Sequence, residues 1–246
     1  MIIFEDEQLL VINKPAGLNT HSPGPFAGEG VYEWLKNREA RWTDLAIIHR
    51  LDKETSGVIV FGKTALANRA LTAQFTARTV SKKYLALTAS PVSFEHLTVK
   101  SALVRAGEKY VNRPLYSGGE QAETRFKSLG SNSGNVLLEA EPVTGRTHQI
   151  RVHAAANGFP VLGDTLYGGA SAARVFLHAA EISFAHPATG MRTTFRAPEN
   201  FDDDPRLALR MACIESASTD AYRVIHGASD RWPGWYVDRL GDFLLS

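Results

Sequence analysis

The segment HRLDKETSG at residues 49–57 lies between two short apolar runs. The runs, LAII at 45–48 and VIVF at 58–61, are rich in β-branched residues, a pattern typical of buried strands. The segment between them is therefore predicted to be a loop that connects two strands. Gly57 provides the backbone freedom to close this loop, and Thr55 and Ser56 can hydrogen-bond to nearby backbone groups. We expect a rigid loop that holds the carboxylate of Asp52 in one position.

The carboxylate of Asp52 has three interpretations. It is a solvated surface group, a partner in a structural ion pair with Arg50 or a more distant arginine, or a catalytic nucleophile or base. Charged loop residues are usually solvated, so the nine residues alone favour the first two interpretations. The rest of the sequence has to decide among the three.

Outside this loop, predicted strands outnumber predicted helices. Strands are expected at residues 9–12, 81–87, 135–141, 175–177 and 193–195. Helices are expected near 31–35, over about 65–78 with Thr64 as N-cap, and over 146–157 before a stop at Gly158. Residues 19–30 are predicted to form an irregular loop, and residues 91–135 short polar strands in hairpins. Short connections between many strands favour an α+β fold with a largely antiparallel sheet.

Composition restricts the class of protein. With 44% hydrophobic and 22% charged residues among 246, the chain is typical of soluble globular proteins. No apolar run approaches the roughly 18 to 20 residues of a membrane span, and the N-terminus lacks the features of a signal peptide, so we expect a cytoplasmic protein. Cys213 is the only cysteine, which excludes an intrachain disulfide and a thiolate metal cluster. At a net charge of +1, a phosphate-binding surface requires local clustering of basic residues.

Three motifs along the chain resemble one known family. HRLDKETSG, together with KPAG at residues 14–17 and GRTHQIRVH at 145–153, is similar to the signature of the RluA-type pseudouridine synthases. The resemblance covers residues 4–200 with the motifs in the expected order. It implies a pseudouridine synthase fold in residues 1–200, with a largely antiparallel mixed sheet flanked by helices and a catalytic cleft across the sheet. It also implies isomerisation of specific uridines in structured RNA, with rRNA favoured over tRNA.

The resemblance assigns roles to individual residues. Asp52 becomes the catalytic carboxylate, and Arg151 of HQIR becomes the guanidinium that pairs with it. Tyr84 of KKYLAL becomes the aromatic that stacks on the target base, and it is the nearest candidate for moving a proton. Contacts with the RNA or the extruded nucleotide are expected from further residues of these motifs, namely Lys14, His49, Arg50, Thr55, Arg146, His148 and Gln149, and Leu177 of FLHA is expected to line the pocket.

The chemistry of the implied reaction agrees with these residue types. Converting uridine to pseudouridine exchanges an N-glycosidic bond for a C-glycosidic one, so it needs a nucleophile or a charge stabiliser and no redox agent. An aspartate with a reference pKa of about 3.9 is already anionic at neutral pH, and an arginine partner favours that state. A uracil stacked in RNA has to be extruded, at a cost of a few kcal/mol, into a pocket with an aromatic or apolar wall.

Each assignment has an ordinary structural alternative. An alternating strand tyrosine such as Tyr84 is usually a core aromatic, a helical arginine such as Arg151 is usually solvated, and Lys14 fits a structural turn. His148 and His153 are five residues apart, which fits helical zinc sites poorly, so no metal is expected. The loop at 163–169 fits neither nucleotide-binding motif, so no cofactor is expected.

Two other functions compete with isomerisation. One is a catalytically silent RNA-binding module of the same fold; the other is a nucleoside or glycoside hydrolase, which would normally need a second carboxylate that the motif of Asp52 does not offer. We expect RNA as the partner, no membrane or metal, and a monomeric chain.

Residues 201–246 carry a separate pattern. Asp202, Asp203, Asp204 and Pro205 are typical of a linker, and a helical segment follows. From Arg223 to Asp242 the pattern R-x-x-x-G-x-x-D-x-x-P-G-x-x-V-D-R-x-G-D resembles the small β-rich module that precedes the catalytic domain of RlmI-type rRNA cytosine methyltransferases. The chain ends within this module and lacks the cofactor-binding turn and catalytic cysteine motif of a methyltransferase. The resemblance implies an incomplete module, with a bifunctional synthase–methyltransferase fusion as an alternative.

Overall fold

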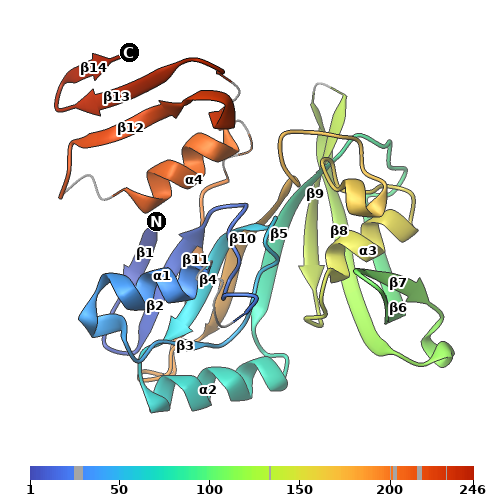
Figure 1. Cartoon of the computed structure of the whole chain (residues 1–246). Helices are drawn as coiled ribbons and strands as arrows, with labels where there is room; N and C mark the ends of the chain where they lie inside the picture. The colour runs from blue at the N-terminus through green and yellow to red at the C-terminus, as the bar shows by residue number, and fades with distance from the viewer. Residues whose placement is uncertain (25–29, 133, 200, 202–203, 215–217, 231) are drawn as a thin grey trace. The chain divides into compact units, whose positions relative to one another are not determined.

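The computed structural model describes residues 1–24, 30–132, 134–199, 201, 204–214, 218–230 and 232–246 (Figure 1). The chain divides into two compact units, one of residues Ile2–Glu199 and one of Met1 with Asn200–Ser246. The first unit contains an 11-stranded sheet and the second a 3-stranded sheet. None of the helices in the described ranges is long and apolar enough to cross a membrane.

The sheet of the first unit is mixed and mostly antiparallel. Its strand order is β1-β2-β4-β10-β5-β9-β8-β6-β7, with β3 paired to β4 and β11 to β10. Only β4 and β10 run parallel among the described pairings. This arrangement confirms the predicted α+β fold. The strands are β1 (Ile2–Glu5), β2 (Leu9–Lys14), β3 (Ala46–Ile47), β4 (Ser56–Gly62), β5 (Ser81–Thr88), β6 (His96–Ala106), β7 (Lys109–Arg113), β8 (Glu120–Asn132), β9 (Asn135–Pro142), β10 (Leu177–Ala185) and β11 (Arg192–Arg196).

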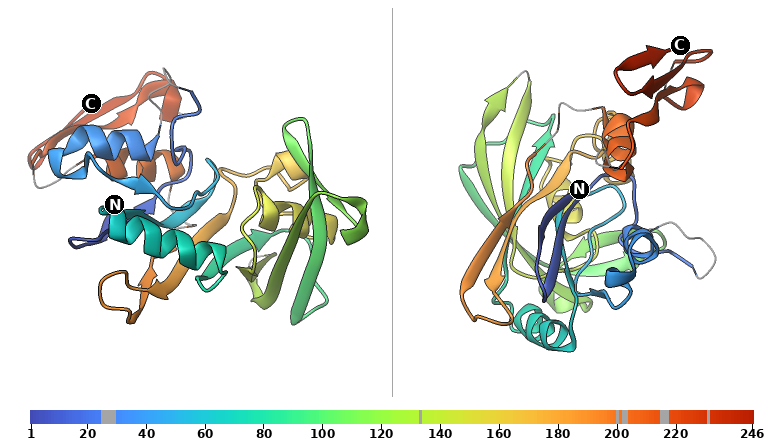
Figure 2. Two further views of the ribbon diagram at one scale, coloured as in Figure 1. Left: turned by 90° about the horizontal axis from the view of Figure 1, so that it is seen from below. Right: turned by 90° about the vertical axis from the view of Figure 1, so that its left-hand side faces the viewer.

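Three helices pack on this sheet: α1 (Val31–Arg38), α2 (Ala65–Thr76) and α3 (Gln149–Ala156). Helix α2 contacts β4 and β10, and α3 contacts β7, β8 and β9. In the left view of Figure 2, α3 (yellow) lies beside the green strands. Helix α2 begins where the sequence predicts, because the side chain of Thr64 accepts a hydrogen bond from the backbone N–H of Ala67 at 3.1 Å. It buries Ala67 and Leu71 on one face, as the helical spacing requires.

Three sequence predictions about elements were wrong in their extent. Helix α3 begins at Gln149 and not at Arg146, because His148 has a left-handed backbone with φ of 55° that interrupts helical geometry. The strand predicted at 175–177 instead begins at Leu177 and continues to Ala185. Residues 91–135 form long strands, β6 of 11 residues and β8 of 13, because the apolar residues on one face of each strand pack into the core while the other face stays polar. The predicted loop at 19–30 is described only in part, since residues 25–29 lie outside the described ranges.

The second unit is small and antiparallel. Helix α4 (Pro205–Cys213) is capped by Asp204, whose side chain accepts hydrogen bonds from the backbone N–H groups of Arg206 and Leu207. Strands β12 (Ala221–His226), β13 (Tyr236–Leu240) and β14 (Phe243–Leu245) follow, with β13 in the middle. Asp202 and Asp203 of the predicted linker lie outside the described residues.

Candidate active site

A cleft of about 1040 Å³ crosses the middle of the large sheet. Its lining comes from the loop before β4, the end of α2, β5, the segment before α3, and the first residue of β10. Ten of the eleven residues predicted to form the site line this cleft, although they are spread over more than a hundred positions of the chain. These residues are His49, Arg50, Asp52, Thr55, Tyr84, Arg146, His148, Gln149, Arg151 and Leu177.

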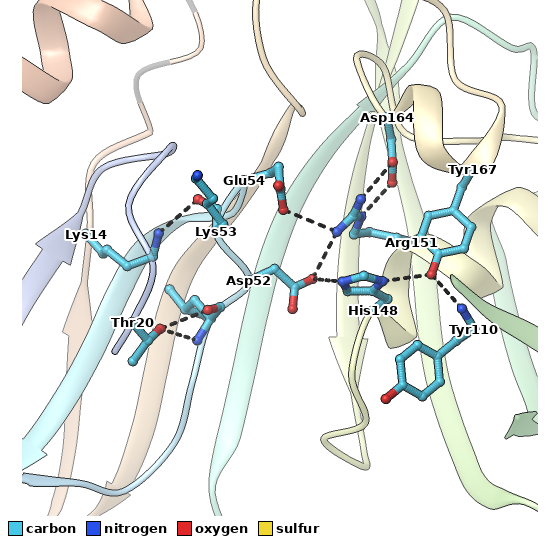
Figure 3. Close-up of polar contacts among 11 residues, drawn as sticks. Lys14, Thr20, Asp52, Lys53, Glu54, Tyr110, His148, Arg151, Asp164 and Tyr167 are labelled. Carbon is cyan, nitrogen blue, oxygen red and sulfur yellow. Dashed lines mark hydrogen bonds and ion pairs between the residues drawn. The ribbon is translucent and has the colours of Figure 1, made fainter. Parts of the chain in front are cut away.

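The loop that carries Asp52 is held by hydrogen bonds from a neighbouring segment. The Thr20 hydroxyl donates to the carbonyl of Leu51 at 2.8 Å and accepts from the backbone N–H of Leu51 at 3.0 Å (Figure 3). The backbone N–H of Thr55 donates to the carbonyl of Asp52 itself at 3.1 Å. These bonds fix the backbone on both sides of the carboxylate, so the predicted rigidity of the loop has a physical basis.

Gly57 lets this loop enter the sheet. Its φ of 116° is in the region that favours glycine, and a Cβ at this position would collide with the backbone of Ala179 on β10. Gly57 and Ala179 are partners in the parallel pairing of β4 with β10. The glycine therefore allows close approach of β4 and β10 at the end of the Asp52 loop.

Arg151 connects the carboxylate of Asp52 to two other acidic residues. Its Nε and Nη2 donate to both carboxylate oxygens of Asp164, at 2.6 and 2.8 Å. Its Nη1 reaches Oδ2 of Asp52 at 3.4 Å and Oε2 of Glu54 at 3.5 Å (Figure 3). Burial alone lowers the pKa of Arg151, but the hydrogen bonds and charge of Asp164 more than offset that effect and raise it. The guanidinium thus remains positive beside Asp52.

Tyr84 forms part of the cleft wall on β5. In the sheet it pairs with Ala179 on β10 and Ala140 on β9, and both neighbours are small enough to leave room around its ring. Burial, with a further contribution from the negative charge of Asp52, raises the pKa of Tyr84. The phenol therefore keeps its proton at neutral pH, close enough to Asp52 to respond to its charge.

His148 approaches Asp52 from the start of α3. Its Nε2 lies 4.0 Å from Oδ2 of Asp52, and its Nδ1 lies 2.7 Å from the hydroxyl of Tyr167. The Tyr167 hydroxyl also accepts a hydrogen bond from the backbone N–H of Tyr110 on β7, at 3.0 Å. His148 therefore has two roles in the structure: its left-handed backbone sets the start of α3, and its side chain lies beside the carboxylate of Asp52.

Two of the predicted RNA contacts, Lys14 and His49, make hydrogen bonds within the protein. Lys14 is buried, and its Nζ donates to the backbone carbonyls of Pro15, Leu18 and Lys53 at 2.9, 2.7 and 3.3 Å, so it supports the Asp52 loop. Burial lowers the pKa of Lys14 to about 7. His49 lines the cleft, but its Nε2 accepts a hydrogen bond from the backbone N–H of Val60 at 3.1 Å, and burial lowers its pKa to about 3.

Of the remaining predicted residues, some are buried and hold the cleft in shape, and others have polar groups in its lining. Gln149 is buried and donates to the Glu123 carbonyl and the Thr124 hydroxyl, which fixes the start of α3. Leu177 is a buried apolar part of the wall. Arg146 is partly open and pairs with Glu120 at 2.9 Å. The buried hydroxyl of Thr55 has no hydrogen-bond partner among the described residues, although the residue lines the cleft.

Sequence reasoning missed three residues of this site. Asp164 and Tyr167 lie in the loop at 163–169, which the sequence marks only as rich in glycine. A signal for Asp164 existed, because a buried arginine requires an acidic partner, and only Asp164, Glu181 and Glu199 follow Arg151 within the first unit. Lys82 also lines the cleft, and burial lowers its pKa to about 8.

No cluster of three or more His, Cys, Asp or Glu side chains that could hold a metal occurs within the described ranges.

Comparisons with known proteins agree on one family. A family model described as RNA pseudouridylate synthase matches residues 8–156. The chain is 39% identical over 206 residues to the Uncharacterized RNA pseudouridine synthase YhcT of Bacillus subtilis (strain 168), covering 80% of this chain and 68% of that protein. It is also 39% identical over 210 residues to the Ribosomal large subunit pseudouridine synthase C of Yersinia pestis, covering 80% and 65%.

A solved structure supports the same relationship. Human RNA Pseudouridylate Synthase Domain Containing 4 matches with a TM-score of 0.67 at 26% identity, covering 85% of this chain and 92% of that one. The chain spans about two thirds of the length of the curated relatives that it matches. These matches confirm the family that the sequence motifs indicate. The chain belongs to the RNA pseudouridylate synthase family.

Proposed function

We propose that this chain is an RNA pseudouridine synthase that isomerises specific uridines of structured RNA, with Asp52 as its catalytic carboxylate. The observation that carries the proposal is the position of Asp52, which lies in the cleft with Oδ2 next to the guanidinium of Arg151 and the ring of His148. The names of several relatives, Ribosomal large subunit pseudouridine synthase C, favour ribosomal RNA over tRNA as the substrate.

The residues of the cleft can serve an isomerisation. The reaction breaks the bond from uracil N1 to the ribose C1′, forms a bond from C5 to C1′, and moves the C5 proton to N1, so its atoms balance without a co-reactant. The anionic carboxylate of Asp52 can stabilise or attack the electron-deficient sugar after the first bond weakens. Arg151 keeps that carboxylate oriented because its own position is fixed by Asp164.

The target base needs a place outside the RNA stack. Tyr84 and Leu177 offer an aromatic and an apolar surface in the same cleft, which suits an extruded uracil. Arg50 is exposed at the cleft edge, where it can occupy the space left by the base or contact a phosphate. Arg146 also lines the cleft and can contact the nucleotide, and the buried hydroxyl of Thr55 lies in the same lining without a hydrogen-bond partner among the described residues. The proposal requires no metal or cofactor, and we place the monomeric enzyme in the cytoplasm.

The decisive experiment compares Asp52→Asn with Asp44→Asn, a matched change at an exposed loop residue outside the cleft. Pseudouridine is mapped in ribosomal and transfer RNA after incubation with each purified variant, and RNA affinity is measured in parallel. Asp52→Asn should bind RNA normally and form no pseudouridine, because the amide keeps the shape and removes the charge. Asp44→Asn should match the wild type. Turnover by Asp52→Asn above a few per cent of wild type would refute the role of Asp52, and an inactive wild type that binds RNA would favour a silent binding module.

We further propose that residues 201–246 begin a β-rich module similar to that of RlmI-type rRNA cytosine methyltransferases. Support comes from the antiparallel sheet of β12, β13 and β14, and from ion pairs within the motif. Arg223 donates to both carboxylate oxygens of Asp238, at 2.8 and 3.0 Å. We assign no methyl transfer to these residues, so the purified chain should form no methylcytosine in ribosomal RNA.

A further inference from the structure

A chain of hydrogen bonds leads from β7 to His148, whose ring lies beside the carboxylate of Asp52. The backbone N–H of Tyr110 donates to the hydroxyl of Tyr167, which lies 2.7 Å from Nδ1 of His148. On the other side of the ring, Nε2 of His148 lies 4.0 Å from Oδ2 of Asp52. Figure 3 shows the three groups arranged in sequence beside Asp52, on the side away from Lys14.

This arrangement selects one tautomer of His148. The Tyr167 oxygen already accepts from Tyr110, so its own proton is free to be donated to Nδ1. In the opposite tautomer, Nδ1 would carry the proton and the lone pair of Nε2 would point at the negative charge of Asp52, which is repulsive. With the proton on Nε2, both sides of the ring make favourable contacts. The geometry therefore favours an Nε2–H group directed at the carboxylate.

The position of the ring is also restrained by packing. Tyr110 and Tyr167 both meet the imidazole edge to face, with ring centroids 5.8 and 5.6 Å from it. The guanidinium of Arg151 lies 5.2 Å from the centroid of Tyr167, which fixes that ring in turn. His148 is thus held by side chains from two other segments as well as by its own backbone.

The charge of His148 matters for Asp52. Burial lowers the pKa of His148, the charges of Asp52, Glu54 and Asp164 act to raise it, and Arg151 acts to lower it, with a net lowering. The ring is then a neutral donor at pH 7, which orients the carboxylate without neutralising it. Both Arg151 and His148 approach the same oxygen, Oδ2. Oδ1 is the oxygen that these two contacts leave to the substrate.

We propose that His148 is a positioning residue of the isomerisation, in which Tyr167 and the Tyr110 backbone fix its Nε2–H tautomer so that this N–H holds Oδ2 of Asp52. The gap of 4.0 Å is longer than a hydrogen bond, and such bonds commonly shorten when substrate occupies an active site. The inference rests on the proposed function, because it assigns to His148 a task in the reaction of Asp52.

Two substitutions separate the contact with Asp52 from the contact with Tyr167. The amide nitrogen of Gln reaches the position of Nε2, so His148→Gln can still donate to Asp52. Asn reaches only the position of Nδ1, so His148→Asn can still accept from Tyr167 but cannot reach Asp52. Asn also adopts left-handed backbone more readily than Gln, so backbone strain would favour the Asn variant. Any advantage of Gln therefore reports on the donor to Asp52.

We expect His148→Gln to keep kcat within roughly tenfold of wild type and His148→Asn to lose on the order of a hundredfold, with KM for RNA nearly unchanged in both. The exposed His96, changed to Gln and Asn in the same way, provides the control and should have no effect. Equal activity of the Asn and Gln variants would overturn the proposal, because the contact with Tyr167 alone would then suffice.

A spectroscopic measurement tests the tautomer without turnover. With ¹⁵N-labelled histidine at pH 7, the signals that disappear in His148→Gln identify this ring, and Nε2 should carry the proton while Nδ1 does not. Tyr167→Phe should give a mixture of tautomers and a lower kcat, whereas Tyr116→Phe, at a side chain that is 91% exposed, should change neither. A proton on Nδ1 in the wild type would refute the proposal. The tautomer is measured without RNA, so its outcome is independent of the Asp52→Asn experiment. Only the Asp52→Asn experiment decides the proposed function.

Discussion

Arg151 and Asp164 form a buried bidentate pair, with Nε to Oδ2 at 2.6 Å and Nη2 to Oδ1 at 2.8 Å. The pair uses two of the three guanidinium nitrogens and leaves Nη1 for Asp52 and Glu54, at 3.4 and 3.5 Å. Asp164 is thus the residue that determines the orientation of Arg151, and through it the direction from which positive charge meets Asp52. The planar fork of arginine suits this task, because two parallel hydrogen bonds fix its plane.

Replacing Asp164 with Asn should therefore affect both stability and turnover. The amide keeps the shape but removes the charge that balances a buried guanidinium, so the free energy of unfolding should fall by about 3 kcal/mol. The value of kcat should also fall, because Arg151 is no longer fixed beside Asp52. Urea unfolding and pseudouridine formation measure the two effects.

The matched control is Glu181→Gln, which breaks a pair of the same type with Arg196, whose side chain is 73% exposed. Exposed pairs contribute at most about 1 kcal/mol, so this variant should remain close to wild type. If the two variants lose the same stability, or if Asp164→Asn turns over normally, Arg151 does not depend on Asp164 in the way described.

At Tyr84, two substitutions distinguish the ring from its hydroxyl. Tyr84→Ala should weaken RNA binding by up to about a hundredfold, since stacking contributes roughly 1 to 3 kcal/mol per base. Tyr84→Phe should bind RNA normally and lose turnover if the hydroxyl moves a proton in the reaction, as we propose; burial and the charge of Asp52 raise the pKa of this hydroxyl. Filter binding and single-turnover kinetics give the two quantities.

Tyr116→Ala provides the reference for general effects of losing a tyrosine, because its side chain is almost fully exposed. Normal turnover by Tyr84→Phe would restrict Tyr84 to a stacking surface. Normal binding and turnover by Tyr84→Ala would mean that the base occupies another part of the cleft.

Much of this cleft was predictable because its chemistry is concentrated in short motifs. Asp52 and Arg151 are 99 positions apart, yet each lies in a distinctive motif, and family resemblance brings them together. Asp164 was not predictable from local pattern, since its glycine-rich loop matches no known binding motif and the partner of a buried arginine depends on tertiary packing. The burial of Lys14 was not predictable for a similar reason, because a lysine after a strand is expected to be exposed, and only the folded chain brings three carbonyls around its Nζ.

The fold shows the same division between local and long-range information. Helix α2 follows from its cap at Thr64 and its apolar spacing, which are both local features. The start of α3 depends on the left-handed backbone of His148, which no periodicity encodes. The parallel pairing of β4 with β10 joins Gly57 to Ala179 and depends on long-range register, so the sequence pattern could only indicate a mostly antiparallel sheet.

Gly57→Ala should lower both the stability of the protein and its activity, because it changes the end of the loop that carries Asp52. The new methyl group would collide with the Ala179 backbone, and a φ of 116° is strained for alanine, so unfolding should become easier by at least about 2 kcal/mol. Gly24→Ala is the control, because open space surrounds that position. A Gly57→Ala variant as stable and active as Gly24→Ala would show that the two strands can separate without moving Asp52.

The buried His153 should make the protein less stable in mild acid. Its Nε2 lies 2.9 Å from the Ser101 hydroxyl and its Nδ1 2.8 Å from the Thr124 hydroxyl, and burial lowers its pKa to about 4. A histidine in the unfolded chain has a pKa of about 6.5. Between pH 6.5 and pH 4, therefore, only the unfolded state binds the proton, so the stability of the protein rises with pH and is lost as the pH falls. At pH 5 the loss from this residue is about 2 kcal/mol. The free energy of unfolding, measured in urea at pH 7 and pH 5, should differ less between the two pH values in His153→Gln than in wild type. The exposed control His96→Gln should behave like wild type. Equal differences in all three proteins would mean that His153 is protonated in the folded state.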